Sequence, residues 1–426
     1  MEGIILILVL VAALFTGVPV AFGIVITVLL GYGVFMDTPL MNIGQAMVTN
    51  VNSFALMAVF FYIMAGQFLS HGRIAQEIVN MCTSVVGKMK GGIAITAVLA
   101  CALFGAVSGS TTATLVAIGG LMFPVMLKAG YDKIFSLSVI LGASTLGIVV
   151  PPSIPEVLYG FLTGVSIFKL FVSGVIPAII IVLIYVVYIR WNCKDVPIDD
   201  SIETGPKALL KAMKSGIWAL FFPVIIFGGI ITGVYTSNEA AVLAAAYAFV
   251  VELFIYRSIN WKEAGQYMLD AVVTTGAVLI LVAGASTFSE TITYLQVPAM
   301  LAEFFAANIT GKWGFLAVIS VILLIAGMLV DNNSAILILT PVLFPMLASY
   351  GVDPVHFGFI MNLNLGVGYL TPPFASSLFL AVNLFDTPYT KVLRAVIAPI
   401  LILLIALALT TFIPQLVLFL PNLISG

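Results

Sequence analysis

Long apolar runs separated by short polar segments fill most of this chain. A helix needs about 20 apolar residues to cross the hydrocarbon core of a bilayer. Ten runs approach that length, near 3–15, 18–36, 53–70, 134–164, 167–190, 215–234, 238–256, 264–296, 355–384 and 395–422. The pattern predicts an all-α polytopic membrane protein. The first run has no cationic start and no small-residue cleavage site, so we expect a retained span.

Two further apolar runs, 91–128 and 313–349, each become polar at mid-length. The polar clusters are Ser108–Thr112 (SGSTT) and Asp331–Ser334 (DNNS). An apolar run that turns polar halfway is typical of a re-entrant helical hairpin whose tip lies inside the membrane. Two short spans joined by a polar loop are the alternative.

The positions of Lys and Arg test this topology. With the N-terminus outside and neither hairpin crossing, 14 of the 16 Lys and Arg residues fall on the cytoplasmic side, and only Lys169 and Lys312 fall outside. Segments 37–52 and 350–354, expected as outer loops, carry none. This asymmetry follows the positive-inside rule, and it predicts that both termini are periplasmic in a bacterial inner membrane.

Composition narrows the classes further. Hydrophobic residues make up 62% of the 426 residues and charged residues 8%, whereas soluble domains are about 25% charged. Cytosolic enzymes, secreted domains and nucleic-acid-binding proteins are therefore excluded. The net charge of −2 leaves no polybasic arm. The three scattered cysteines predict neither a disulfide framework nor a metal cluster.

The two halves of the chain repeat each other at an offset near 221 residues. Gapless matches include Phe123-Pro124 with Phe344-Pro345, Gly130 with Gly351, Asp132 with Asp353, Gly147 with Gly368, and Pro151-Pro152 with Pro372-Pro373. Each half has five crossings, an odd number, so the repeats are predicted to be inverted, as in secondary transporters.

The repeat sets the predicted domain boundaries. Residues 1–190 form the first repeat, 191–214 a cytoplasmic linker and 215–426 the second repeat. Each repeat contains one hairpin and one broken helix, the broken helices being near 134–164 and 355–384.

Each half pairs a polar hairpin tip with a Gly-rich helix break that ends in Pro-Pro. Proline removes backbone donors and forces the preceding residue out of helical geometry, and carbonyls freed inside a membrane need a partner. Uncharged oxygen ligands suit a sodium ion, and helix N-termini suit a carboxylate. Close helix packing is the alternative reason for small residues here.

From these constellations we predict two sets of ligands and no organic cofactor. The sodium ligands are predicted at Ser108, Ser110, Thr111, Gly142, Thr145, Val150, Gly327, Asp331, Asn332, Gly366 and Thr371. Substrate contacts are predicted at Gly109, Thr112, Ser153, Asn333, Ser334 and Pro373.

Acidic residues inside membrane segments are rare and usually functional. Asp331 is expected to be an ion ligand, with a buried structural acceptor as the alternative. Glu239 follows Thr236 and Ser237, so we expect it to cap a helix. For Glu156 and Glu290, the sequence favours neither a functional nor a structural role. His71 and His356 stand at span ends, where an interfacial position is expected.

Three rival functions were weighed against a carrier. An intramembrane protease needs a deep Ser–His pair or two aspartates, and neither is evident. A primary pump needs a phosphate-binding loop such as G-x-x-x-x-G-K-[ST], which is absent from the sequence. An ion channel stays open as an alternative.

Four motifs carry a resemblance to a known family. They are FGAVSGSTTAT at 104–114, LGASTLGIVVPPSIPEVLYG at 141–160, GIITGVYTSNEAAV at 229–242 and NLGVGYLTPPFASSLFL at 364–380. At these motifs, and over essentially its whole length, the chain resembles the large membrane subunit of tripartite ATP-independent periplasmic (TRAP) transporters.

The resemblance implies a mechanism and partners. The fold would be an elevator carrier whose mobile domain comprises about 53–164 and 264–384 and whose remainder is a scaffold. The partners would be a small four-span membrane subunit and a periplasmic substrate-binding protein, with a sodium gradient as the driving force. The substrate would be an organic acid such as sialic acid, a dicarboxylate or a sugar acid; a carboxylate carrier that acts alone is the alternative.

Overall fold

The computed structural model describes residues 2–16, 18–36, 38–193 and 203–425, and over these residues the chain is helical without a β-strand. The all-α class is thus confirmed. Eight described helices are long and apolar enough to cross a membrane, and α14 with α15, bent by 69°, is a candidate for a ninth. The ten crossings counted from the sequence include shorter helices and stay a prediction. Of the predicted linker, residues 194–202 lie outside the described residues.

The first half contains thirteen α-helices among the described residues. They are α1 (Glu2–Phe15), α2 (Val20–Leu30), α3 (Met41–Val51), α4 (Phe54–His71), α5 (Ile74–Val86), α6 (Gly92–Ser108), α7 (Thr111–Thr114), α8 (Gly120–Lys128), α9 (Lys133–Ser144), α10 (Leu146–Val149), α11 (Ile154–Thr163), α12 (Ile167–Ser173) and α13 (Val175–Asn192). Short π-helical turns at Gly31–Phe35 and Leu115–Gly119 extend α2 and join α7 to α8.

The second half contains twelve. They are α14 (Pro206–Ser215), α15 (Ile217–Ile231), α16 (Ser237–Val250), α17 (Trp261–Tyr294), α18 (Val297–Asn308), α19 (Gly311–Leu329), α20 (Asn332–Leu343), α21 (Pro354–Gly368), α22 (Ser376–Leu384), α23 (Tyr389–Ala395), α24 (Ile397–Phe412) and α25 (Gln415–Ser425). A π-helical turn, Val251–Ile255, extends α16, and two 3-10 turns follow α20.

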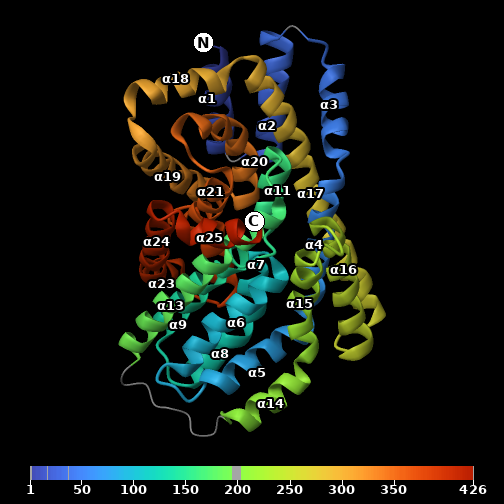
Figure 1. Cartoon of the computed structure of the whole chain (residues 1–426), viewed down its shortest axis with the longest axis vertical. Helices are drawn as coiled ribbons and strands as arrows, with labels where there is room; N and C mark the ends of the chain where they lie inside the picture. The colour runs from blue at the N-terminus through green and yellow to red at the C-terminus, as the bar shows by residue number, and fades with distance from the viewer. Residues whose placement is uncertain (1, 17, 37, 194–202, 426) are drawn as a thin grey trace.

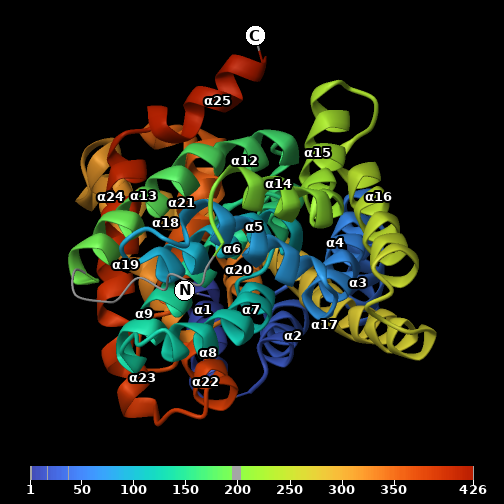
Figure 2. The same cartoon turned by 90° about the horizontal axis from the view of Figure 1, so that it is seen from below.

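The helices form two unequal groups. Figure 2 shows α3, α4, α15, α16 and α17 together on one side, where α16 packs on α4 and α15, and α17 packs on α3 and α4. Outside this group, α21 packs against α10, α11, α12, α19, α20, α24 and α25 and is buried from Val355 to Gly368. A helix that is apolar on all sides and buried on all sides belongs to the core of a bundle.

One segment differs from its sequence-based interpretation. Residues 37–52 were expected to form an outer loop, but they contain α3, which packs along α17 (Figure 1). The segment has few charges and includes Ile43, which is buried.

Helical geometry is interrupted in both halves at Pro-Pro. Helix α10 ends at Val149 and α11 begins at Ile154, while α21 ends at Gly368 and α22 begins at Ser376. Both Pro-Pro bonds are cis. The first break leads into α11, which packs on α20 near the middle of the molecule (Figure 1).

In each half, two glycines bring a hairpin helix against a broken helix. A Cβ on Gly105 would lie 3.0 Å from Gly147 Cα, and a Cβ on Gly327 would lie 3.0 Å from Gly368 Cα. Real Cβ contacts are rarely this close, so only glycine fits without displacing backbone. These two contacts hold α6 against α10 and α19 against α21.

We predict that Gly327→Ala lowers the stability of the folded chain. Its Cβ would lie 2.8 Å from the backbone oxygen of Leu365, and overpacking of this kind costs about 1–3 kcal/mol. Gly120→Ala is the matched control, because this glycine has helical geometry and its Cβ would meet nothing within 4 Å. Thermal unfolding in one detergent compares the two variants. A Gly327→Ala chain as stable as wild type would contradict the close approach.

Candidate functional site

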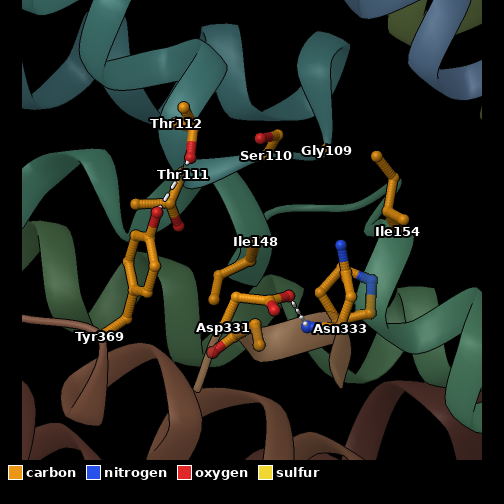
Figure 3. Close-up of a pocket in the computed structure, with 11 residues that line it drawn as sticks. Gly109, Ser110, Thr111, Thr112, Ile148, Ile154, Asp331, Asn333 and Tyr369 are labelled. Carbon is orange, nitrogen blue, oxygen red and sulfur yellow. Dashed lines mark hydrogen bonds between the residues drawn. The ribbon is translucent and has the colours of Figure 1, made fainter. Parts of the chain in front are cut away.

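The two polar tips face each other across a cavity of about 110 Å³ (Figure 3). The first tip supplies Gly109–Thr112 and the second Asp331–Asn333. The remaining lining residues come from the helix breaks, and they are Ile148, Ile154, Pro155 and Tyr369. None of these described lining residues is Lys, Arg or His.

Corresponding positions of the two halves line this cavity. At the offset of 221 residues, Ser110 matches Asp331, Thr111 matches Asn332, Thr112 matches Asn333 and Ile148 matches Tyr369. The three hydroxyls of the first tip are thus replaced by one carboxylate and two amides in the second. The two sides of the cavity have related positions but different chemistry.

The first tip turns through a glycine. Gly109 has φ +61°, which favours a residue without Cβ. Ser110 then caps α7 by accepting a hydrogen bond from the N–H of Ala113 at 3.4 Å. Thr114 Oγ1 donates to the carbonyl of Ser110 at 2.9 Å and lies 3.1 Å from Ser108 Oγ. Hydroxyl contacts therefore stabilise the turn from within.

The second tip is organised by Asp331. Its Oδ1 accepts hydrogen bonds from the N–H groups of Asn333 at 3.1 Å and Ser334 at 3.2 Å, and its Oδ2 accepts from Ser334 Oγ at 2.5 Å. Asp331 is thus the N-cap of α20 and also lines the cavity. An N-cap carboxylate stabilises a helix by satisfying its free donors.

Several polar atoms at the tips have no hydrogen-bond partner. They are Thr111 Oγ1, Asn333 Oδ1 and both polar side-chain atoms of Asn332, and all of them are buried. Buried polar groups are normally paired, so each unpaired atom requires an explanation. The residues that carry these atoms, Thr111, Asn332 and Asn333, all line the cavity, which makes the cavity a candidate site for a polar ligand.

Sequence reasoning missed Tyr369, which connects the two halves. Its hydroxyl lies 3.2 Å from Thr112 Oγ1 across the cavity (Figure 3). The repeat offers a signal for it, because Tyr369 follows Gly368 as Ile148 follows Gly147. Ile148, Ile154 and Pro155 also line the cavity and were missed, since they stand on either side of the Pro-Pro break.

Some predicted residues lie behind the cavity. Ser108 and Ser334 stabilise the tips from the rear. Thr145 contacts Gly366, where a Cβ on the glycine would lie 3.1 Å from Thr145 Cγ2, and its buried Oγ1 has no partner. Ser153 is fully buried and lies 3.3 Å from the amide nitrogen of Asn362.

The other predicted residues have separate surroundings. Gly142 packs against Tyr185 and Pro399, and Gly327 packs against Gly368. Val150 borders an apolar groove between α5, α6, α13 and α15. The structure does not bring these residues to the cavity.

Two more lie at the second break. Thr371 Oγ1 donates to the carbonyl of Val367 at 2.8 Å, and the carbonyl of Pro373 accepts from the Tyr389 hydroxyl at 2.6 Å. Neither residue lines the cavity.

The structure confirms one prediction made for the remaining acidic residues and histidines and corrects another. Glu239 forms a capping box with Thr236, as predicted. Glu290 accepts hydrogen bonds from Asn50 at 3.0 Å and Tyr32 at 3.4 Å. The expectation of an interfacial His356 is wrong, because this residue is fully buried and its Nε2 lies 2.9 Å from the carbonyl of Thr410. Packing of α24 on α21 encloses it.

Membrane-length helices and a polar cavity beside two interrupted helices are the architecture typical of secondary transporters. The chain is a member of the DctM component family of tripartite ATP-independent periplasmic transporters, whose family model matches residues 7–416. It is therefore a large membrane subunit of this transporter family and not an enzyme.

Curated relatives support this membership. The chain is 36% identical over 371 residues to a C4-dicarboxylate TRAP transporter large permease of Pseudomonas aeruginosa, covering 87% of this chain and 86% of the relative. It is 37% identical over 383 residues to an ectoine TRAP transporter large permease of Halomonas elongata, covering 89% of each. It is 34% identical over 407 residues to an isethionate TRAP transporter permease of Oleidesulfovibrio alaskensis, covering 95% of this chain but 64% of that longer relative.

A solved structure supports the fold alone. The chain superposes on the Alcanivorax borkumensis YdaH transporter with a TM-score of 0.65 at 16% identity, covering 88% of each chain. The family and this architecture indicate a multi-pass protein of the bacterial inner membrane.

We predict a measurable coupling between Tyr369 and Thr112. A single hydrogen bond contributes about 0.5–1.5 kcal/mol, so Tyr369→Phe and Thr112→Val should each destabilise the chain. The double variant should lose less stability than the sum of the two single losses. Free energies of unfolding for the four chains give the coupling energy. Full additivity would show that the two hydroxyls do not interact.

Proposed function

We propose that this chain is the membrane carrier of a sodium-coupled transporter that takes up a small organic acid delivered by a periplasmic binding protein. The observation that carries the proposal is the cavity between the tips, with its unpartnered buried atoms on Thr111, Asn332 and Asn333. A polar ligand would supply the missing hydrogen bonds, and its release would again leave these atoms unpaired.

The chemistry of the cavity suits an anion. Helices that start at Thr111, Asn332 and Ile154 all begin at its wall. Helix N-termini carry partial positive charge and free N–H groups. The described lining offers no basic side chain, and the caps Ser110 and Asp331 already accept from N–H groups of α7 and α20. The acid would therefore be held mainly by hydroxyl and amide donors, with support from the partial positive charge of the helix N-termini.

The volume of the cavity bears on substrate size. Sites for drug-sized ligands begin at about 300 Å³, and this cavity measures about 110 Å³. That volume favours a four-carbon dicarboxylate or a comparably small acid over sialic acid and other sugar acids. The names of the relatives, which include a dicarboxylate and isethionate, agree with a small acid.

Sodium is the coupling ion in this proposal. Oxygen atoms are the ligands that hard cations prefer, and the tips and breaks supply hydroxyl, amide, carboxylate and carbonyl oxygens. Thr145 Oγ1, which has no partner, adds a free ligand at the contact with Gly366. The residues predicted from the sequence remain the candidate ligands.

An elevator movement is proposed for the translocation step. The glycine contacts Gly105–Gly147 and Gly327–Gly368 support a rigid unit in each half, because hairpin and broken helix can separate only by losing them. Thr112 and Tyr369 connect the two units across the cavity. The mobile domain would then be about 53–164 with 264–384, moving against the remainder, with both termini periplasmic.

Transport should depend on two partners, a small membrane subunit and the binding protein. The outer segments predicted for this chain are short, and none forms a domain that could capture a dilute acid. Proteoliposomes with the chain and small subunit should take up the acid only after the binding protein is added. Uptake by the purified chain alone would instead favour a carrier that acts by itself, and single-channel currents would favour a channel.

We predict that Asp331→Asn weakens sodium activation of uptake severalfold while leaving the fold intact. Asparagine is as good an N-cap as aspartate, so α20 should still form, but a charged ion ligand is lost. Ser110→Ala should act more mildly, because it removes one neutral oxygen among several. A coupling free energy of about 1–3 kcal/mol means that apparent substrate affinity should fall as well.

The matched control is Asp132→Asn. Asp132 caps α9 with hydrogen bonds to Ile134 and Phe135 at 2.8 and 3.1 Å, and it is exposed outside the cavity. Uptake against sodium concentration should be unchanged in this variant. If Asp331→Asn follows the same curve as Asp132→Asn, Asp331 is only a helix cap. Equal uptake in potassium and sodium would refute sodium coupling altogether.

A further inference from the structure

A buried polar cluster lies directly behind the cavity wall. It consists of Glu156 in the first turn of α11, Ser153 at its N-cap, Asn362 on α21 and the carbonyl of Ile148; we name it the Glu156 cluster. Glu156 and Asn362 are each 1% exposed, and Ser153 is fully buried. The amide nitrogen of Asn362 lies 2.8 Å from the Ile148 carbonyl, 3.3 Å from Ser153 Oγ and 3.4 Å from Glu156 Oε1.

The hydrogen bonding of this cluster is incomplete. An amide nitrogen carries two hydrogens, so it cannot donate fully to three oxygen atoms. Glu156 Oε2 and Asn362 Oδ1 are buried without any partner. A buried carboxylate in apolar surroundings is costly unless it is neutralised. The cluster therefore needs one more positive group.

The neighbouring helices do not supply that group. Within the described residues, no Lys, Arg or His forms an ion pair with Glu156. Apart from Glu156, the titratable or charged groups on or capping α11 and the helices packed against it (α4, α12, α20 and α21) are Tyr62, His71, Tyr159, Lys169, Asp331, Asp353, His356 and Tyr369.

These groups have other partners or lie in solvent. Tyr62 and Tyr159 donate to the carbonyls of Ser237 and Pro354, and His71 bonds the carbonyl of Gln67. Lys169 is exposed. Asp331 and Asp353 cap their own helices, and His356 bonds Thr410. The Tyr369 hydroxyl lies 3.2 Å from Thr112 Oγ1.

We propose that the Glu156 cluster is an exchangeable cation site at which a proton and a sodium ion compete. With the proton bound, Glu156 is a neutral acid. When sodium enters, the O–H bond breaks, the proton leaves to water, and the carboxylate keeps the electron pair. Sodium is then ligated by Glu156, Ser153 Oγ, the Ile148 carbonyl and, after the amide turns over, Asn362 Oδ1. All four are oxygen ligands of the kind hard cations prefer.

The position of the cluster connects it to the tip cavity. Ile148, Ile154 and Pro155 line that cavity and are neighbours of the cluster along the backbone. A change of occupant at Glu156 therefore acts on the wall that the acid would touch. The inference rests on the proposed function for this coupling role, but the exchange itself can be measured without transport.

Infrared difference spectroscopy of the purified full chain in lipid nanodiscs tests the exchange. Replacing choline by sodium at constant pH should remove a carboxylic-acid C=O band and release a proton, which a pH indicator detects. Glu156→Gln, which preserves size, should abolish both signals. Glu290→Gln is the matched control, because Glu290 is exposed and already hydrogen-bonded, and it should leave both unchanged.

Ser153→Ala provides a second variant that retains the acid. It should keep the band but raise severalfold the sodium concentration needed to remove it. A band that ignores sodium, or that persists in Glu156→Gln, would overturn the proposal. Because neither signal requires substrate or partners, a failure of uptake in the complete system would refute the proposed function while leaving this inference standing.

Discussion

Helix ends that lie inside apolar surroundings must find partners for their free N–H groups, and this requirement organises the whole molecule. Two N-cap side chains meet it at the tips, Ser110 and Asp331, whereas Asp132 and Asp353 cap the broken helices at exposed positions. Without the two tip caps, α7 and α20 would each leave donors unsatisfied at a helix end inside the protein. The caps are what allow helices to begin in the middle of the protein and point their N-termini at one cavity.

Close packing then fixes where the capped ends lie. Gly105 with Gly147 and Gly327 with Gly368 bring backbone against backbone, which no other residue allows. Membrane helices associate through such contacts because lipid supplies little hydrophobic driving force between them. The glycines therefore have the packing role that was the alternative explanation for small residues at these positions. The same packing places the polar tips beside the helix breaks.

Local sequence patterns predicted the features that depend on neighbouring residues in the chain. Apolar runs gave the helical class, TSNE gave the Glu239 cap, and the polar clusters marked the tips that line the cavity. Contacts between distant segments were beyond their reach. The Tyr369–Thr112 contact, the enclosure of His356 by α24 and the packing of Gly142 on Tyr185 depend on how helices far apart in the chain meet. The sequence gives no sign of whether a glycine or threonine binds an ion or packs against another helix. It therefore did not distinguish these two roles for Gly142 and Thr145.

The two halves share positions but have diverged in chemistry, and this asymmetry has a consequence for how they work together. At the repeat offset, Asn362 and Asn364 of α21 correspond to Leu141 and Ala143 of α9. Only the second half thus carries a buried amide that reaches across to the other break, where it bonds the Ile148 carbonyl. The first half supplies Glu156 and Ser153 but has no amide of its own at that point. Because the cavity also takes hydroxyls from one tip and a carboxylate with amides from the other, neither half can build either polar site alone. Both the cavity and the Glu156 cluster therefore depend on contacts between the two halves.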